Sequence, residues 1–388
     1  MKKGISPVIS TVFLILITIS ATYIVMNVVK PTIDRAYEAG VMNEAEQNMR
    51  LLDNLIREVA SEGRGSLRTV VLKVTDGNYK IINTSGNFTG ALQFNIELKH
   101  SPFAAPMLKR VGNLKYTAGM NSVGLIGYWN LNERNGTKAE DSSGYGNHGT
   151  LYNGSSICSN PPSAGCPEWV EGKFGRALSF DGVDDYVSIP QSSFNFASDS
   201  AFTIATWVYF NGSGSERGIV SNGEGNARGW MLFWRGDSYY MYWRNSNGTQ
   251  GDDLYFNANG YQNRWVHIVA IWNNGYKALY LNGSKVAQKS TSLTLGGYPT
   301  RDLYIGRKDS FSTIFNGTID EVRIYNRALS EEEIKENYNA KASNYQIVLE
   351  YGKIVLMGNI RFSKGTHKIC IEKIGELSNK PLIKIFFC

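Results

Sequence analysis

The sequence predicts an α+β protein with three parts: a long N-terminal hydrophobic helix, a small β-rich head and an inserted all-β sandwich. Residues 4–29 carry no charge, which predicts the helix. The chain holds 40 glycines and 12% aromatic residues against 19% charged ones, a balance typical of β-rich extracellular proteins. Strand-like runs before residue 121 return after residue 342, which indicates one domain interrupted by another.

Length and charge restrict the function classes. A chain of 388 residues is long enough for two or three domains, each with its own core. The net charge of +6 is spread along the chain, without a block of Lys or Arg. We therefore expect no nucleic-acid partner.

The hydrophobic segment, residues 5–29, opens a predicted stalk helix over 5–65. It exceeds the roughly 7–15 apolar residues of a secretory signal and suffices for the about 20 that span a bilayer. Beyond Pro31, where we expect a kink, apolar residues recur every three or four positions, and Gly63 and Gly65 end the pattern. The predicted buried stripe comprises Met42, Ala45, Met49, Leu52, Ile56 and Val59.

The residues before the hydrophobic segment carry a processing motif. Lys2, Lys3 and Gly4 precede Ile5, Ser6 and Pro7. This junction resembles the class III signal of archaeal type IV pilin-like proteins, although no glutamate follows it as in bacterial members.

The pilin resemblance implies a fate for the chain. It implies a leader of residues 1–4, cleaved between Gly4 and Ile5 by a prepilin peptidase. It also implies insertion in the membrane before assembly, then self-association through the N-terminal helix, and with other pilin subunits, in an extracellular cell-surface filament. A membrane-anchored, non-polymerising extracellular carbohydrate-binding protein remains the alternative.

The head is predicted in two pieces, residues 66–121 and 342–388. Runs such as TVVLKV and LQFNIELKH in the first piece, and KICIEKI in the second, are β-branched or aromatic and bounded by turn residues. Because neither piece alone makes a sheet of adequate size, we expect the two to share one.

The insert, residues 122–341, contains short strand-like runs separated by Gly/Asn turns, as in a β-sandwich. Ser330 and Glu333 are spaced as a capping box that opens a short helix. The segments GLIGYWNLNERNGTKAEDSSGYGNHG, GKFGRALSFDGVDDYVSIP and FNGTIDEVRIYNRALSEEEIKENY resemble laminin-G-like, concanavalin A-like jelly-roll modules. That resemblance implies adhesion, or recognition of glycans or of other cell surfaces.

Catalysis is not expected. The same jelly-roll architecture hosts glucanases, which resemble one another in a Glu-x-Asp-x-x-Glu strand, and this sequence lacks that spacing. Asp184 and Asp185 are adjacent, so we expect their side chains on opposite faces of a strand. An extracellular glycan hydrolase is kept as a second alternative.

A ligand-binding face is predicted on the hairpin GWMLFWRGDSYYMYWRN. Its aromatic residues occupy neighbouring positions, so alternation places some of them on an outer face where rings stack on sugars. The candidates are Trp234, Arg235, Tyr240, Tyr242, Trp243 and Arg244. The alternative is that these residues belong to the core or pack against a partner strand.

A structural calcium ion is the predicted cofactor. By resemblance to modules in which the first and last segments lie side by side, it is placed between EDSSGYGNHG and TIDEV. The predicted ligands are Asp141, a carbonyl at Gly144, Asn147 and Asp320, since Ca²⁺ takes carboxylate, amide and carbonyl oxygens. The alternative is that Asp141 and Asn147 close a turn and Asp320 binds neighbouring backbone.

Cysteines and sequons fit an exported protein. The four cysteines form two local pairs, Cys158 with Cys166 and Cys370 with Cys388, which predicts disulfides, with four free thiols as the alternative. Asn-x-Ser/Thr sequons, candidate glycosylation sites unless they arise by chance, begin at Asn83, Asn87, Asn135, Asn153, Asn211, Asn247, Asn282 and Asn316.

Overall fold

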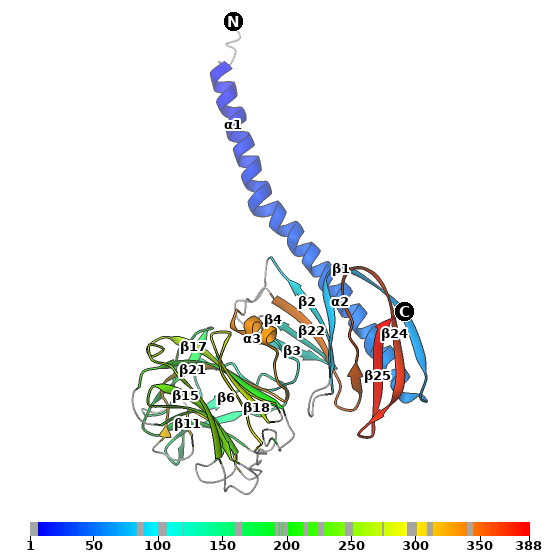
Figure 1. The fold of residues 1–388 in the computed structure, drawn as a ribbon. Helices are drawn as coiled ribbons and strands as arrows, with labels where there is room; N and C mark the ends of the chain where they lie inside the picture. The colour runs from blue at the N-terminus through cyan, green and yellow to red at the C-terminus, as the bar shows by residue number, and fades with distance from the viewer. Residues whose placement is uncertain are drawn as a thin grey trace.

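A computed structural model gives the fold, one long N-terminal helix followed by mostly β structure (Figure 1). It describes residues 7–83, 89–99, 107–118, 120–159, 165–190, 194, 196, 201–212, 216–223, 229–244, 251–273, 275–292, 301–308, 313–339 and 344–388. The predicted leader cleavage site, Gly4 and Ile5, lies outside these residues.

The N-terminal helix comprises α1 (Pro7–Ile24), a π-helical segment (Val25–Val29) and α2 (Lys30–Ser61). The π-helical segment ends at Val29, two residues before Pro31, which lacks an N–H to donate to the helical ladder. At Pro31, where we expected a kink, the chain remains helical and continues as α2 (Figure 1). Polar side chains in the apolar half bond their own backbone, as Thr18 Oγ1 does with the carbonyl of Leu14 at 2.8 Å.

The second half of the helix packs on the head through the predicted stripe. Ala45, Met49, Leu52, Ile56 and Val59 are buried, while Met42 packs at the edge of the same core. The period of three and four residues therefore predicted this face correctly. By contrast, α1 projects away from the head (Figure 1). Its large apolar side chains from Val12 onward are exposed.

The head sheet combines strands from both ends of the chain. Its order is β23-β25-β24-β1-β2-β22-β4-β3. Strands β4 and β22 pair antiparallel, with Ala118 directly opposite Tyr345, so the two chain segments that flank the insert are neighbours. The bounds are β1 Leu67–Ile82, β2 Ala91–Glu97, β3 Met107–Val111, β4 Leu114–Ala118, β22 Asn344–Glu350, β23 Val355–Met357, β24 Arg361–Leu377 and β25 Lys380–Phe387.

Residues between these two segments form the module, a sandwich of two antiparallel sheets. The first sheet has the order β19-β18-β17-β12-β21-β10-β9, with β5 also paired to β21. Its strands are β5 Leu125–Trp129, β9 Glu168–Glu171, β10 Arg176–Asp181, β12 Phe202–Phe210, β17 Trp265–Asn273, β18 Tyr276–Leu281, β19 Ser284–Ser290 and β21 Asn316–Tyr325.

The second sheet of the module has the order β16-β15-β14-β13-β20-β11-β7-β6, with β8 paired to β7. Its strands are β6 Lys138–Ala139, β7 Gly149–Asn153, β8 Ser156–Ile157, β11 Asp185–Ile189, β13 Arg217–Gly223, β14 Gly229–Arg235, β15 Ser238–Arg244, β16 Gly251–Asn257 and β20 Leu303–Ile305.

The inner faces of the two sheets share one core. Trp230 and Trp234 from the second sheet pack with Phe202 and Phe210 from the first, and the rings of Phe210 and Trp234 lie 4.6 Å apart. Helix α3 (Glu331–Tyr338) closes the module with the predicted capping box, in which Ser330 accepts from the Glu333 amide.

Polar contacts join the module to the head. Glu350 of the head, which forms an ion pair with Lys115 of the same sheet, accepts from the backbone N–H of Gly124 in the module at 2.6 Å. The guanidinium of Arg110 lies over the ring of Tyr145 at 4.5 Å. These contacts lie beside the chain crossings into and out of the insert.

Candidate functional site

The candidate site is the outer face of the second sheet of the module. Side chains along β14 and β15 point alternately to the core and to this outer face. Trp230, Leu232 and Trp234 point inward and are at most 2% exposed. The intervening Phe233 and Arg235 belong to the opposite face, because successive strand side chains alternate. The rest of the site is built on this opposite face.

Three aromatic rings stack across neighbouring strands on this face. Phe233 of β14 pairs with Tyr240 of β15, and Tyr240 pairs with Tyr255 of β16. The ring centroids lie 5.3 Å apart in the first pair and 5.2 Å apart in the second. Phe233 is buried, whereas Tyr255 is 57% exposed, so the ladder emerges from the sheet toward solvent.

Basic side chains border the ladder. Lys308 Nζ lies 4.7 Å from the Phe233 ring centroid, and the Arg235 guanidinium lies 5.9 Å from that of Tyr240. Glu216 pairs with Lys308 and lies 3.6 Å from Arg235. The Arg235 side chain is 58% exposed, so its remaining donors reach solvent beside the exposed rings.

A row of residues extends this face across the sheet. The pairing register places Asp253, Tyr242, Met231, Ser221 and Tyr304 directly opposite one another on five successive strands. We call Phe233, Arg235, Tyr240, Tyr242 and Tyr255 the aromatic face.

A second group of tyrosines lies at the far end of that row. Tyr152 stacks on Tyr186 with centroids 5.0 Å apart, and Tyr186 meets Tyr304 edge-on at 5.6 Å. The Arg307 guanidinium covers Tyr186 and Tyr304 at 4.7 and 4.8 Å. Burial raises the pKa of Tyr186, and the nearby Arg307 charge opposes that rise.

The chemistry of the aromatic face suits a polyhydroxylated ligand. Tyrosine offers a flat apolar ring with a polar tip, and Arg offers several donors in fixed geometry. Rings of this kind cover the C–H faces of sugars while neighbouring donors bind hydroxyl or carboxylate oxygens. The face therefore has the components of a binding surface.

The predicted binding residues do not all lie on one surface. Arg235, Tyr240 and Tyr242 lie on the aromatic face. The prediction for Trp234 was wrong, because its side chain is fully buried in the core. Strand alternation places Trp234 on the inner face of the sheet and the adjacent Phe233 on the outer face. The side chains of Trp243 and Arg244 lie outside the part that the structure describes.

Sequence reasoning missed Phe233 and Tyr255 as members of the ladder. Phe233 stood among the hairpin aromatics without being selected, and Tyr255 lies on β16, a strand further along the chain. The alternation in GDDLYFN places Tyr255 on one face with Asp253, but only the register shows that it meets Tyr240.

The first predicted metal segment forms a closed turn. Asp141 Oδ1 accepts from the backbone N–H groups of Tyr128 at 3.0 Å and Ser143 at 2.8 Å, and Oδ2 accepts from that of Asn147 at 2.9 Å. Asn147 Nδ2 donates to the carbonyl of Ile126 at 3.1 Å. Gly144 has a φ of +84° and lies against Arg110 of the head.

The second predicted metal segment has other partners. Asp320 lies on β21 and is fully buried, and its Oδ2 accepts from the backbone N–H of Phe174 at 3.0 Å. Burial and the neighbouring charge of Glu321 raise the pKa of Asp320. Its Oδ1 has no hydrogen-bond partner in the described chain, which suits a ligand atom. The calcium ion at Asp141, Gly144, Asn147 and Asp320 stays a prediction.

Both predicted disulfides are present. Cys158 bonds Cys166 and Cys370 bonds Cys388, with Cα atoms 6.0 and 5.7 Å apart. Among the sequons, Asn87 and Asn247 lie outside the described residues. Asn83 and Asn282 use their side-chain oxygens to accept from the backbone of Gly358 and His267.

Comparison with known proteins agrees with the fold of the module. Residues 181–335 match the Laminin_G_3 family of the concanavalin A-like lectin/glucanases superfamily. Botulinum neurotoxin type X from Clostridium botulinum is 24% identical over 186 residues, which are 44% of this chain and 14% of the toxin. The match therefore spans a small part of that relative.

Two solved structures are similar at lower identity. Domain 4 of AbnA, a GH43 extracellular arabinanase from Geobacillus stearothermophilus solved with arabinotriose, is 18% identical with a TM-score of 0.44, covering 56% of this chain and 98% of that domain. The binding domain of Paraclostridial Mosquitocidal Protein 1 is 19% identical with a TM-score of 0.45, covering 56% and 52%. The family match over residues 181–335 supports a laminin-G-like, concanavalin A-like jelly roll in the inserted module.

Proposed function

We propose that the chain is a pilin-like subunit of a cell-surface filament and that its module binds glycans or other surfaces. The observation that carries the filament proposal is the exposed apolar helix. By length and composition this helix could cross a membrane, and its most apolar stretch is not buried in the rest of the protein. Phe13, Leu14 and Ile17 are each more than 60% exposed.

An exposed surface of this kind requires a partner. Burying each large apolar side chain contributes roughly 1.5–3 kcal/mol, so about a dozen of them strongly favour either lipid or other helices. A helix satisfies its own backbone hydrogen bonds in both surroundings. Before assembly the membrane covers this helix, and in the filament neighbouring copies cover it.

The amphipathic half of the helix supports the filament over a plain anchor. The stripe from Val41 to Val59 fixes the head rigidly to the helix. A filament needs this rigid connection, because each head must keep a fixed orientation relative to its packed helix. A membrane-anchored, non-polymerising binding protein does not need it.

Substitution in the apolar half tests assembly. Leu14→Asp places a charge where neighbouring helices pack and should abolish filaments, while Leu14→Met, which conserves volume and polarity, should preserve them. Electron microscopy of the cell surface provides the readout, with membrane fractionation to verify that both variants reach the membrane. Normal filaments from Leu14→Asp, with the protein present in them, would contradict the proposal.

Processing provides a separate test. N-terminal sequencing of mature protein from filaments should begin at Ile5. A mature chain that still begins at Met1, or that begins beyond Val29, would exclude the pilin-like pathway.

The binding role rests on the aromatic face. Tyr255→Ala and Tyr240→Ala should each weaken binding of the full chain to immobilised glycans or to whole cells by about tenfold or more, since aromatic anchors dominate such interfaces. Tyr276→Ala, on the opposite sheet of the module, is the matched control and should bind normally. Equal binding by all three variants would remove the aromatic face as the site.

An activity assay on the wild-type chain tests the hydrolase alternative. The purified full chain should release no reducing sugar from a glycan to which it binds. Release of sugar by the wild-type chain would favour the glycan hydrolase instead.

A further inference from the structure

The turn between β10 and β11 brings three carboxylates together outside the sites described above. Asp181 ends β10, Asp185 begins β11, and Asp184 precedes it. One oxygen of each lies within 4.8 Å of the others. The expectation that Asp184 and Asp185 point to opposite faces was wrong, because Asp184 belongs to the turn and does not follow strand alternation.

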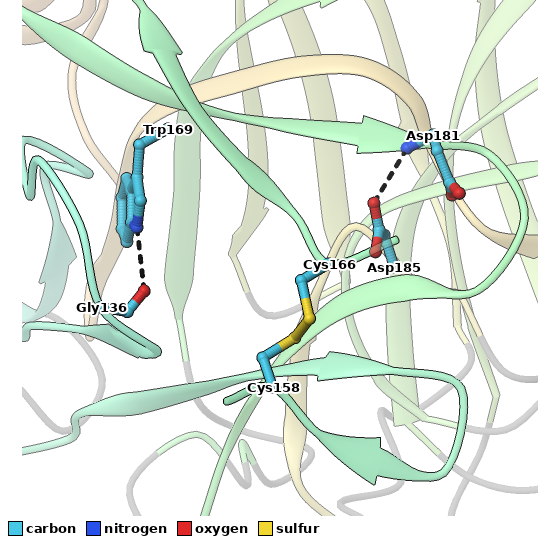
Figure 2. The surroundings of a disulfide bond; sticks show 6 residues. All are labelled: Gly136, Cys158, Cys166, Trp169, Asp181 and Asp185. Carbon is cyan, nitrogen blue, oxygen red and sulfur yellow. Dashed lines mark hydrogen bonds between the residues drawn. A yellow bond between two sulfur atoms is a disulfide. The ribbon is translucent and has the colours of Figure 1, made fainter. Parts of the chain in front are cut away.

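Backbone donors satisfy only part of this cluster. Asp181 Oδ1 accepts from the N–H of Val183 at 2.8 Å. Asp185 Oδ2 accepts from the N–H of Asp181 at 3.2 Å, the dashed contact at the right of Figure 2. These bonds fix the turn and orient two of the carboxylates.

Asp185 contains an atom that these bonds do not explain. The residue is only 2% exposed, and its Oδ1 has no hydrogen-bond partner within the described part of the chain. A buried oxygen that carries negative charge normally has a donor or a cation beside it. The missing partner therefore points to a positive ligand at this place.

No basic side chain supplies that charge among the described residues. The ion pairs there include none with Asp181, Asp184 or Asp185. Arg217 lies beside the turn, but it donates to the carbonyls of Gly182 at 3.0 Å and Ile314 at 3.2 Å.

Neighbouring segments hold the cluster in place, and one of them places an amide beside it. Asn153 is directly opposite Asp185 in the pairing of β7 with β11, which places its amide on the same face. The N–H of Gly154 donates to the carbonyl of Asp184 at 2.9 Å. The Cys158–Cys166 disulfide fastens the adjoining β7–β8 hairpin next to this turn (Figure 2).

We propose that Asp181, Asp184 and Asp185 bind one calcium ion, with the Asn153 amide and water completing the coordination. The donors are all oxygens, which selects a hard cation over zinc or copper. Three carboxylates, a neutral amide and bound water can together supply the six to eight oxygens that Ca²⁺ takes in flexible geometry. Mg²⁺ demands near-ideal octahedral geometry and loses its water reluctantly, so it should bind more weakly.

The site is distinct from the calcium ion predicted at Asp141 and Asp320, so the test must separate the two. The full chain, purified in detergent, is titrated with Ca²⁺ by calorimetry and with Tb³⁺ by luminescence. We expect saturable Ca²⁺ binding that displaces Tb³⁺. Asp184→Asn should weaken this binding at least tenfold, because it removes one charged ligand from a half-exposed position without changing the side chain's shape.

Two further variants make the result specific. Asp253→Asn removes an exposed carboxylate from β16 and should leave Ca²⁺ affinity unchanged. Asp185→Asn should abolish binding at the turn while circular dichroism shows the native fold. Absence of saturable Ca²⁺ binding by the wild-type chain would refute the site, as would full affinity in Asp184→Asn. Binding that is lost in Asp320→Asn but kept in Asp184→Asn would place the ion at the other location and also refute it.

Discussion

Arg323 is a buried charged residue, and the stability of the module depends on its ion pair. It forms an ion pair with Glu321, and the Tyr128 hydroxyl donates to the same carboxylate at 3.0 Å. All three residues are at most 1% exposed. Arg323→Met would leave Glu321 buried without its cation, a change that costs roughly 3–5 kcal/mol.

Urea unfolding followed by tryptophan fluorescence measures this cost, because all eight tryptophans lie between residues 122 and 341. Lys138→Met is the control, since it breaks an exposed pair with Glu140 and should change the free energy of unfolding by about 0.5 kcal/mol or less. Equal effects of the two substitutions would show that the buried pair is dispensable.

His267 predicts a pH dependence of stability. Burial, with a smaller contribution from Arg323, lowers its pKa from 6.5 to about 3. Between these values the unfolded chain binds a proton that the folded chain does not, so stability falls as pH falls from about 6.5 toward 3. One proton corresponds to a slope of about 1.4 kcal/mol per pH unit.

A substitution at His267 separates the effect of this proton on stability from the effect of the carboxyl groups that titrate in the same pH range. His267→Gln should lose stability less steeply than the wild-type chain between pH 6.5 and 4.5, measured by urea unfolding. His148→Gln, at a histidine whose side chain is 37% exposed, serves as the comparison variant. A wild-type slope in His267→Gln would mean that His267 is already charged in the folded module.

At the scale of elements, α2 should contribute to stability through one face only. Ile56 is fully buried against the head sheet, whereas Leu51 is 42% exposed. Ile56→Ala should cost roughly 2–5 kcal/mol and Leu51→Ala much less, because only the first leaves a cavity. Hydrogen exchange of the β1 and β24 amides provides the measurement, and equal protection in both variants would contradict the packing.

Elements with a regular hydrophobic period could be predicted from the sequence. The stripe of α2 repeats every three or four residues, and runs such as FTIATWVYF became β12 in the module core. The capping box of α3 likewise depends on a local spacing. In each case the physical cause lies within about a dozen neighbouring residues.

Sites that depend on register could not be predicted in the same way. Trp234 and Phe233 are adjacent, and nothing local says which of them faces the core. Tyr255 joins Tyr240 only through the pairing of β15 with β16. The meeting of Asp181, Asp184 and Asp185 depends on the turn geometry between β10 and β11, which strand alternation does not describe.

For the whole molecule, the insertion predicts that the module can be removed. Ala118 and Tyr345 are opposite each other in the head sheet, so a short linker can replace residues 122–341. We expect the shortened chain to assemble into filaments that no longer attach to glycans or cells, as judged by electron microscopy and an adhesion assay. A head that fails to fold, or filaments that still attach, would refute this division of roles.

The filament proposal concerns the arrangement of whole chains. Cryo-electron microscopy of purified surface filaments tests it most directly. We expect a reconstruction in which α1 helices from successive copies pack in a central core, with heads and modules on the outside. The exposed apolar side chains between Thr11 and Val29 would then contact one another in that core. Filaments that lack this chain, with the protein dispersed singly in the membrane, would contradict the filament proposal.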